Sequence, residues 1–160
     1  MKKAFKLLAA LTVLTVLLIP TGCIMLVGGG GGDTYYGFGW TASLDSFESS
    51  AAPDSIKIKN TLGEPLSVKY KIFLHDNPND YDKEIEPDWD TISVSKNLQA
   101  APGLVEVVPQ INFIEKGVSY TDAVVWIRVQ NADNSKYLAF SVHIQDASDT
   151  EWNITISKKN

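Results

Sequence analysis

The chain has 160 residues, of which 44% are hydrophobic, and its formal net charge of −5 comes from 14 basic and 19 acidic residues. This length suits one ordinary globular domain, whose core is large enough to need neither a disulfide nor a structural metal. The only arginine is Arg128. Because Lys and Arg supply most of the affinity for phosphate backbones, the acidic balance excludes nucleic acid as the expected partner.

The N-terminal segment has the layout of an export signal. Three lysines precede an apolar run over residues 7–19. The run leads to the letters PTGC at residues 20–23, which resemble the lipobox of bacterial lipoproteins. The resemblance implies a signal peptide over residues 1–22, cleavage before Cys23 and acylation of its thiol, for instance with palmitate. Residues 1–22 hold three lysines and no acidic residue, so cleavage would change the formal charge from −5 to −8.

Cys23 is the only cysteine, so an internal disulfide is excluded and modification of the thiol is the expected use. A second interpretation is an uncleaved transmembrane anchor, since residues 7–27 approach the roughly 20 apolar residues that cross a bilayer. The preceding lysines orient such a helix with the domain outside the cytoplasm. Both interpretations place the domain in the cell envelope. Ile24, in place of Asp, favours the outer membrane under the sorting rule of enterobacteria.

Residues 23–54 have the composition of a linker. Five successive glycines impose no conformation, and residues 41–53 are rich in Ser and Ala. Between them, residues 35–40 hold four aromatic rings. We expect these rings to dock on the protein's own domain, with the membrane surface and a partner as alternatives. The folded domain is therefore expected to span residues 55–160.

From Ser55 onward, apolar and polar residues alternate with a period of two, which predicts β-strands with one wet face. The expected strands cover residues 56–59, 66–74, 91–95, 104–114 with a bend at Pro109, 123–130, 136–145 and 152–158. Seven strands with short connections predict an all-β fold, an antiparallel β-sandwich of Ig-like or transthyretin-like outline.

The connection over residues 75–90 is acidic, with seven carboxylates and one lysine. Calcium takes about six to eight oxygen ligands, so the loop is a candidate calcium site. Its weak candidate ligands are Asp76, Asp80, Asp82 and Glu84. Because the loop lacks the glycine of an EF-hand and Pro78 interrupts the spacing, a solvated polar loop is the expectation and calcium the alternative.

Aromatic residues outside the expected strands mark a candidate contact surface. Tyr81 and Trp89 in the acidic loop, with Trp40 in the linker, are the rings that we expect to be exposed. Exposed rings serve protein contacts and sugar stacking alike, so a protein partner and a carbohydrate are both candidates. Trp126 and Trp152 lie on expected strands and belong in the core.

The sequence holds no constellation typical of an enzyme. His75 and His143 are the only histidines, which is too few for a metal site or for a nucleophile–histidine pair. Both are expected to be ordinary strand or surface residues. We therefore predict no catalytic residue, no metal ligand beyond the weak calcium candidates, and no cofactor.

An acyl anchor, a linker and one all-β domain together predict a non-enzymatic envelope lipoprotein whose partner is another protein. This layout resembles that of the outer-membrane lipoprotein of type VI secretion systems, and the resemblance covers the architecture alone. It implies a transthyretin-like sandwich that serves as an assembly component. A carbohydrate-binding or calcium-stabilised adhesion module is the alternative.

Overall fold

The computed structural model describes residues 34–48, 54–76, 86–100, 103–146 and 150–159. Within these ranges every regular element is a β-strand except one 3₁₀ turn, so the predicted all-β class is confirmed. The elements are β1 (Thr34–Gly37), β2 (Trp40–Glu48), β3 (Ser55–Asn60), β4 (Leu66–His75), the turn η2 (Trp89–Thr91), β5 (Lys96–Leu98), β6 (Leu104–Val108), β7 (Ile114–Glu115), β8 (Val118–Ser119), β9 (Asp122–Asn131), β10 (Tyr137–Gln145) and β11 (Thr150–Lys158).

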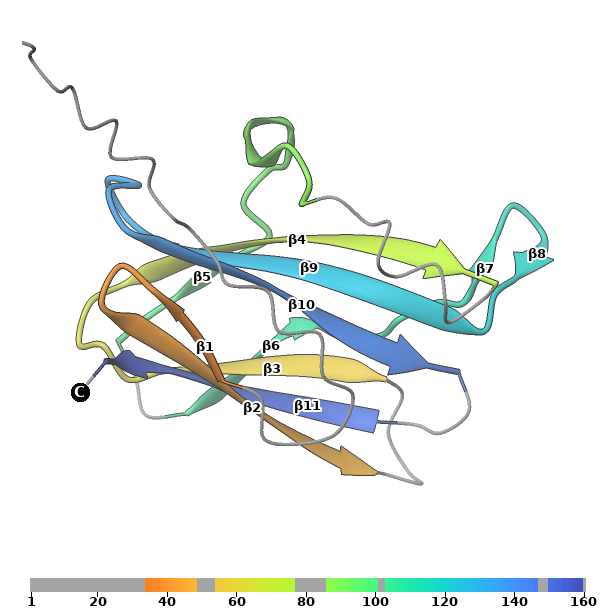
Figure 1. Ribbon diagram of the computed structural model, residues 1–160, viewed down its shortest axis with the longest axis horizontal. Helices are drawn as coiled ribbons and strands as arrows, with labels where there is room; N and C mark the ends of the chain where they lie inside the picture. Colours follow the sequence, from red (N-terminus) through yellow and green to blue (C-terminus); the bar gives the residue numbers. More distant parts are fainter. Residues whose placement is uncertain (1–33, 49–53, 77–85, 101–102, 147–149, 160) are drawn as a thin grey trace, which may run out of the picture.

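Two larger sheets lie face to face, an arrangement consistent with a β-sandwich (Figure 1). Sheet A has the strand order β1-β2-β11-β3-β6, and sheet B has the order β10-β9-β4-β5. Strands β7 and β8 form a separate two-stranded hairpin. All neighbours pair antiparallel except β11 and β3, which run parallel. The predicted antiparallel pairing therefore holds for the other pairs of the described residues and is wrong at this one.

The core lies between the two sheets because alternate residues of each strand point inward. Sheet A contributes residues from β2, β3 and β11, and sheet B contributes residues from β4, β9 and β10. The Phe140 ring of β10 stacks on the Tyr35 ring of β1, with 5.4 Å between the centroids. Each fully buried aliphatic or aromatic side chain stabilises the fold by roughly 1.5–3 kcal/mol.

A second, smaller apolar cluster covers part of the outer face of sheet B. Val124 and Trp126 of β9 pack there with Ala139 of β10 and Trp89 of η2. This cluster explains why β9 is apolar on both faces, since the strand has β10 and β4 on either side and is covered above and below.

The prediction of a linker over residues 23–54 is wrong for residues 34–48, which form β1 and β2. Strand β2 pairs antiparallel with β11 along its whole length, so it is an integral part of sheet A. Trp40, Ala42 and Leu44 point into the core. The polar residues between them gave the segment the composition of a linker, although its apolar positions recur with a period of two. The prediction that the aromatic rings dock on the domain is confirmed for Tyr35 and Trp40, which are both buried.

Two further boundaries differ from the expected strands. The strand expected over residues 91–95 is wrong, because Asp88 caps η2 by accepting a hydrogen bond from the Asp90 N–H at 3.1 Å. Hydrogen bonding to β4 begins only at Ser95, whose N–H donates to the Val68 carbonyl at 2.8 Å, and it continues through β5. The strand expected over residues 104–114 ends at Val108, before Pro109, which has no N–H to donate to a ladder.

Candidate binding surface

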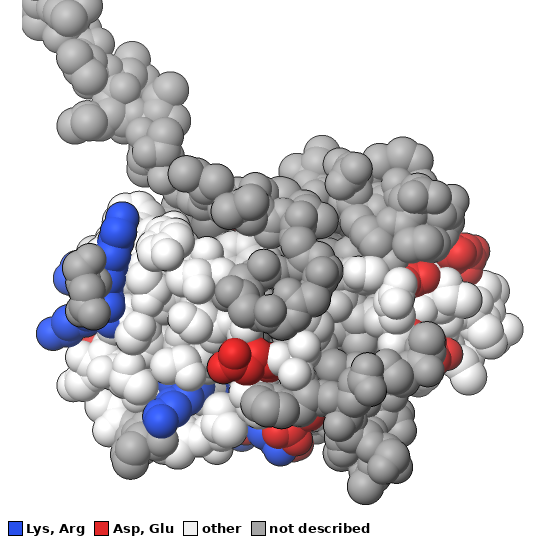
Figure 2. Space-filling view, turned by 60° about the horizontal axis from the view of Figure 1, so that its bottom comes forward, with Lys and Arg blue, Asp and Glu red and all other residues white. Residues whose placement is uncertain are grey.

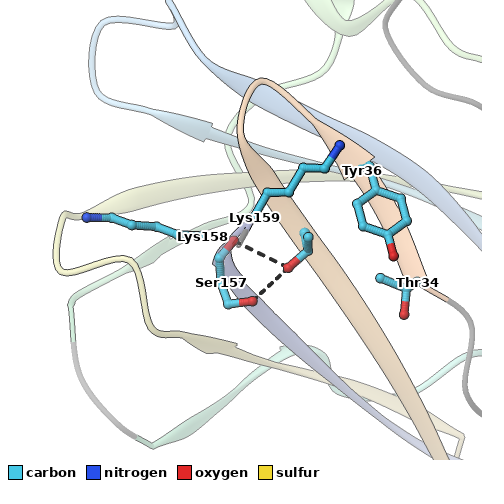
Figure 3. Close-up of a pocket in the computed structure, with 6 residues that line it drawn as sticks. Thr34, Tyr36, Ser157, Lys158 and Lys159 are labelled. Atoms are coloured by element: carbon cyan, nitrogen blue, oxygen red, sulfur yellow. Dashed lines mark hydrogen bonds between the residues drawn. The ribbon is translucent and has the colours of Figure 1, made fainter.

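An open hollow of about 460 Å³ lies on the outer face of sheet A, where β1, β2 and β11 run side by side (Figure 3). Its lining consists of Thr34, Tyr36, Thr41, Ser157, Lys158 and Lys159. The alternation of the strands places the two hydroxyl residues of the hollow. Since Ala42 and Ile156 are buried in the core, their neighbours Thr41 and Ser157 point to the opposite face.

Hydroxyl groups and ammonium groups give the hollow its chemistry. The Thr41 Oγ1 and Ser157 Oγ atoms share a hydrogen bond of 2.7 Å. The Lys159 ammonium lies 5.2 Å from the centroid of the Tyr36 ring, a cation–π contact. No carboxylate is among the residues that line the hollow. The hollow therefore suits a ligand group that carries negative charge or accepts hydrogen bonds.

The β1–β2 turn projects two aromatic rings beside the hollow. Phe38 and Gly39 both have positive φ angles, 49° and 79°, as the tight two-residue turn of a hairpin requires. Tyr36 is 52% exposed and Phe38 is 41% exposed. A Cβ atom at Gly37 would lie 2.9 Å from the Leu138 side chain, so the turn packs closely against β10. The exposed rings are therefore held by a well-packed turn.

Cationic and aromatic groups continue from this turn onto sheet B. The Phe38 ring contacts the Tyr137 ring at a centroid distance of 4.8 Å. The guanidinium carbon of Arg128 lies 4.0 Å from the centroid of the Tyr137 ring. We call the residues Lys159, Tyr36, Phe38, Tyr137 and Arg128 the cation–aromatic strip. Figure 2 shows basic side chains gathered at the left end of the molecule and several acidic ones at the right.

Two histidines flank a buried carboxylate at the other end of sheet B. His75 of β4 pairs directly with Asp122 of β9, and the Nε2 atom of His143 lies 3.2 Å from the Asp122 Oδ1 atom. The Thr121 hydroxyl donates to Asp122 Oδ2 at 2.5 Å. Burial lowers the pKa of His143, although Asp122 acts in the opposite direction. Nothing in the sequence relates the two histidines to each other. The strand register nevertheless brings both next to one carboxylate, that of Asp122.

The predicted contact surface is wrong at two of its three residues. Trp40 is only 3% exposed because it points into the core at the start of β2. Trp89 is 6% exposed, since its ring packs on Trp126 and its indole N–H donates to Glu86 Oε1 at 2.6 Å. Tyr81 lies outside the described residues. Trp126 is buried as predicted, in the outer cluster of sheet B.

The calcium and acylation predictions are not decided by the described residues. Asp76 is exposed at the end of β4. Asp80, Asp82, Glu84 and Cys23 all lie outside the described ranges. In the part of the chain that the structure describes, no group of three or more His, Cys, Asp or Glu residues is arranged to hold a metal ion.

The chain matches no protein-family description, no curated protein and no solved structure. Among the residues that the structure describes, no helix is both long and apolar enough to span a membrane. Residues 7–27, the alternative transmembrane anchor, lie outside those ranges.

Proposed function

We propose that the chain is a lipid-anchored protein of the cell envelope that binds another envelope protein and catalyses no reaction. The observation that carries the proposal is the cation–aromatic strip beside its hollow. Tyr and Arg are enriched at the energetic centres of protein interfaces, where rigid rings supply contact area at a low entropic cost. The lipobox-like residues 20–23 support the acyl anchor, and Ile24 supports the outer membrane as its location.

The fold type and the role in assembly belong to the same proposal. Two facing sheets support a sandwich of Ig-like or transthyretin-like type. The layout of the sequence, a lipobox-like segment followed by one all-β domain, resembles that of the outer-membrane lipoprotein of type VI secretion systems, and this resemblance supports a role in envelope assembly. A protein partner is favoured over a neutral sugar because cations lie against two rings of the strip, Lys159 against Tyr36 and Arg128 against Tyr137, and cations attract the anionic groups that proteins carry.

Photo-crosslinking in the cells that make the protein tests whether a protein is bound. A photoreactive phenylalanine analogue is placed at Tyr36 or Phe38 and, as matched controls, at the exposed positions Val94 and Val118. We expect irradiation to give one discrete protein adduct from the first two positions and none from the controls. The absence of any protein adduct at Tyr36 and Phe38 would contradict the proposal.

A further inference from the structure

We infer that the cation–aromatic strip binds an acidic segment of the partner protein, in which carboxylates flank an apolar side chain. The inference rests on the proposed function and adds the chemistry of the partner. It follows from three features of the strip: cations without internal partners, a guanidinium held in place by stacking, and a hollow that fits a carboxylate.

The cations of the strip have no carboxylate to pair with inside the described part of the chain. Lys57, by contrast, pairs with Glu151 at 2.6 Å, and Lys116 approaches Glu115 at 3.8 Å. Arg128 and Lys159 instead lie over aromatic rings. In a chain with a net charge of −5, a cluster of unpaired cations at one end creates a local positive field that attracts an anionic partner.

Arg128 is arranged to take a carboxylate in a forked hydrogen bond. Its guanidinium stacks on the Tyr137 ring, which leaves the planar N–H edge to bind a ligand. Its buried Nε atom has no hydrogen-bond partner in the described structure and is shielded from a ligand, so the fork is offered by the two terminal Nη groups. Because the stacking already restricts the side chain, binding costs less conformational entropy than it would for a free arginine. A bidentate arginine–carboxylate pair is also stronger and more directional than a lysine contact.

The hollow supplies the second anionic site, at the Lys159 end of the strip. A carboxylate that enters it meets the Lys159 ammonium group and the hydroxyls of Thr41 and Ser157, whereas the Lys158 side chain extends away from the hollow (Figure 3). Between the two cationic ends, the exposed rings of Tyr36 and Phe38 offer an apolar contact. The arrangement therefore matches carboxylates on either side of an apolar residue.

The extent of the partner's charge favours a protein segment over a membrane surface. A short acidic segment meets only the local positive field of the strip, whereas an extended anionic bilayer also meets the acidic remainder of the domain, which it repels. The one carboxylate in the turn next to Tyr137, on Asp133, is already engaged by the Ser135 hydroxyl at 2.7 Å. Asp133 therefore does not take the place of a partner's carboxylate at the cations of the strip.

The test uses the full chain, purified in a non-ionic detergent, and a fluorescein-labelled peptide in which single Phe residues alternate with pairs of Glu. A second peptide carries Gln in place of Glu. Fluorescence anisotropy gives the Kd of each peptide at low and at high salt. We compare the double variant Arg128→Gln/Lys159→Gln with the matched double variant Lys71→Gln/Lys116→Gln, which removes the same charge from exposed lysines of β4 and of the β7–β8 turn.

We expect the Glu peptide to bind saturably to the wild type and the Gln peptide to bind at least about tenfold more weakly. The strip variant should raise the Kd about tenfold or more, and the matched variant by less than about twofold. Lys159→Gln alone, at an exposed residue beyond β11, should give part of the loss if the double variant fails to fold. Equal losses in both double variants, or no saturable binding by the wild type, would overturn the inference.

A further experiment with lipid vesicles distinguishes an acidic protein segment from anionic lipid headgroups as the ligand of the strip. The protein is embedded in nanodiscs of neutral lipid and mixed with vesicles that contain phosphatidylglycerol. Binding to these vesicles that depends on Arg128 and Lys159 and displaces the Glu peptide would assign the strip to headgroups and overturn the inference. A crosslink from Tyr36 to a basic or neutral protein segment would also overturn it while the proposed function stood. Peptide binding without any protein adduct in cells would contradict the proposed function instead.

Discussion

Phe140 is the residue at which we can most easily test which face of β10 points into the core. Its ring is 1% exposed and stacks on Tyr35, so Phe140→Ala leaves a cavity in the centre of the core. We expect the free energy of unfolding to fall by about 3–5 kcal/mol. Lys71→Ala, at an exposed position of β4, should change it by no more than about 0.5 kcal/mol. Urea unfolding measures both, and similar losses would mean that the inward and outward faces are exchanged.

His143 is the residue through which pH should change stability. Burial lowers its pKa from 6.5 in the folded state, against Asp122, which raises it, and His75 faces the same site and lowers it further. The unfolded chain therefore binds this proton more tightly than the folded chain does. The contribution of His143 to stability is complete above about pH 6.5 and is lost as the pH falls through that value toward the lower folded pKa.

The pH prediction is measured by comparing the wild type with His143→Gln, which keeps a polar group beside Asp122 and does not titrate. We expect the urea midpoint of the wild type to fall more steeply than that of the variant between about pH 7 and pH 5. The other titrating groups are present in both proteins, so the difference reports His143 together with its coupling to Asp122 and His75. Parallel profiles, or a steeper fall in the variant, would contradict the assigned direction of the pKa shift.

At the scale of the element, β2 decides where the domain begins. It lies between β1 and β11, and it places Trp40, Ala42 and Leu44 in the core. A chain that starts at Ser55 loses these side chains. It also exposes the edge of β11 that pairs with β2 in the complete domain. We expect a chain starting at Thr34 to unfold cooperatively, and one starting at Ser55 to show a broad transition or to aggregate. Equally cooperative unfolding of both chains would mean that β1 and β2 contribute little to stability.

Strands with a strong two-residue period are predictable from this sequence, and strands with polar or short patterns are not. The long alternation in β4 and β10 and the apolar run of β9 place these strands to within a residue or two. In β2, small polar residues hide the period within the composition of a linker. The parallel pairing of β3 with β11 also has no local signal, because it depends on which sheet edge each strand reaches.

The candidate binding surface is less predictable than the fold because pairing register creates it. Thr41 and Ser157 are far apart in the sequence and meet only because β2 pairs with β11 in this register. The sequence shows Tyr36 and Phe38 as members of an aromatic cluster, but composition alone does not show which ring points outward. Trp40, the ring of this cluster predicted to be exposed, is the one that the period of β2 turns inward.

At the scale of the whole molecule, the tether sets how the cation–aromatic strip meets a partner. Residues 24–33 separate Cys23 from β1, and ten residues reach at most about 35 Å when fully extended. An acyl anchor at Cys23 would therefore hold the domain within about one bilayer thickness of the membrane surface. The partner of the strip is then expected to be a protein of the same membrane or one that reaches its surface.

Acylation of Cys23 is the prediction on which this picture of the molecule depends. Cys23→Ala should abolish the incorporation of labelled palmitate and leave an uncleaved precursor that migrates more slowly in gel electrophoresis. Ile24→Ala, the matched control, should retain the label, because it leaves the thiol in place. Since Cys23 is the only cysteine, thiol-linked label in the wild type has no other site. A wild-type chain that takes up no label and keeps Met1 would instead identify residues 7–27 as an uncleaved transmembrane anchor.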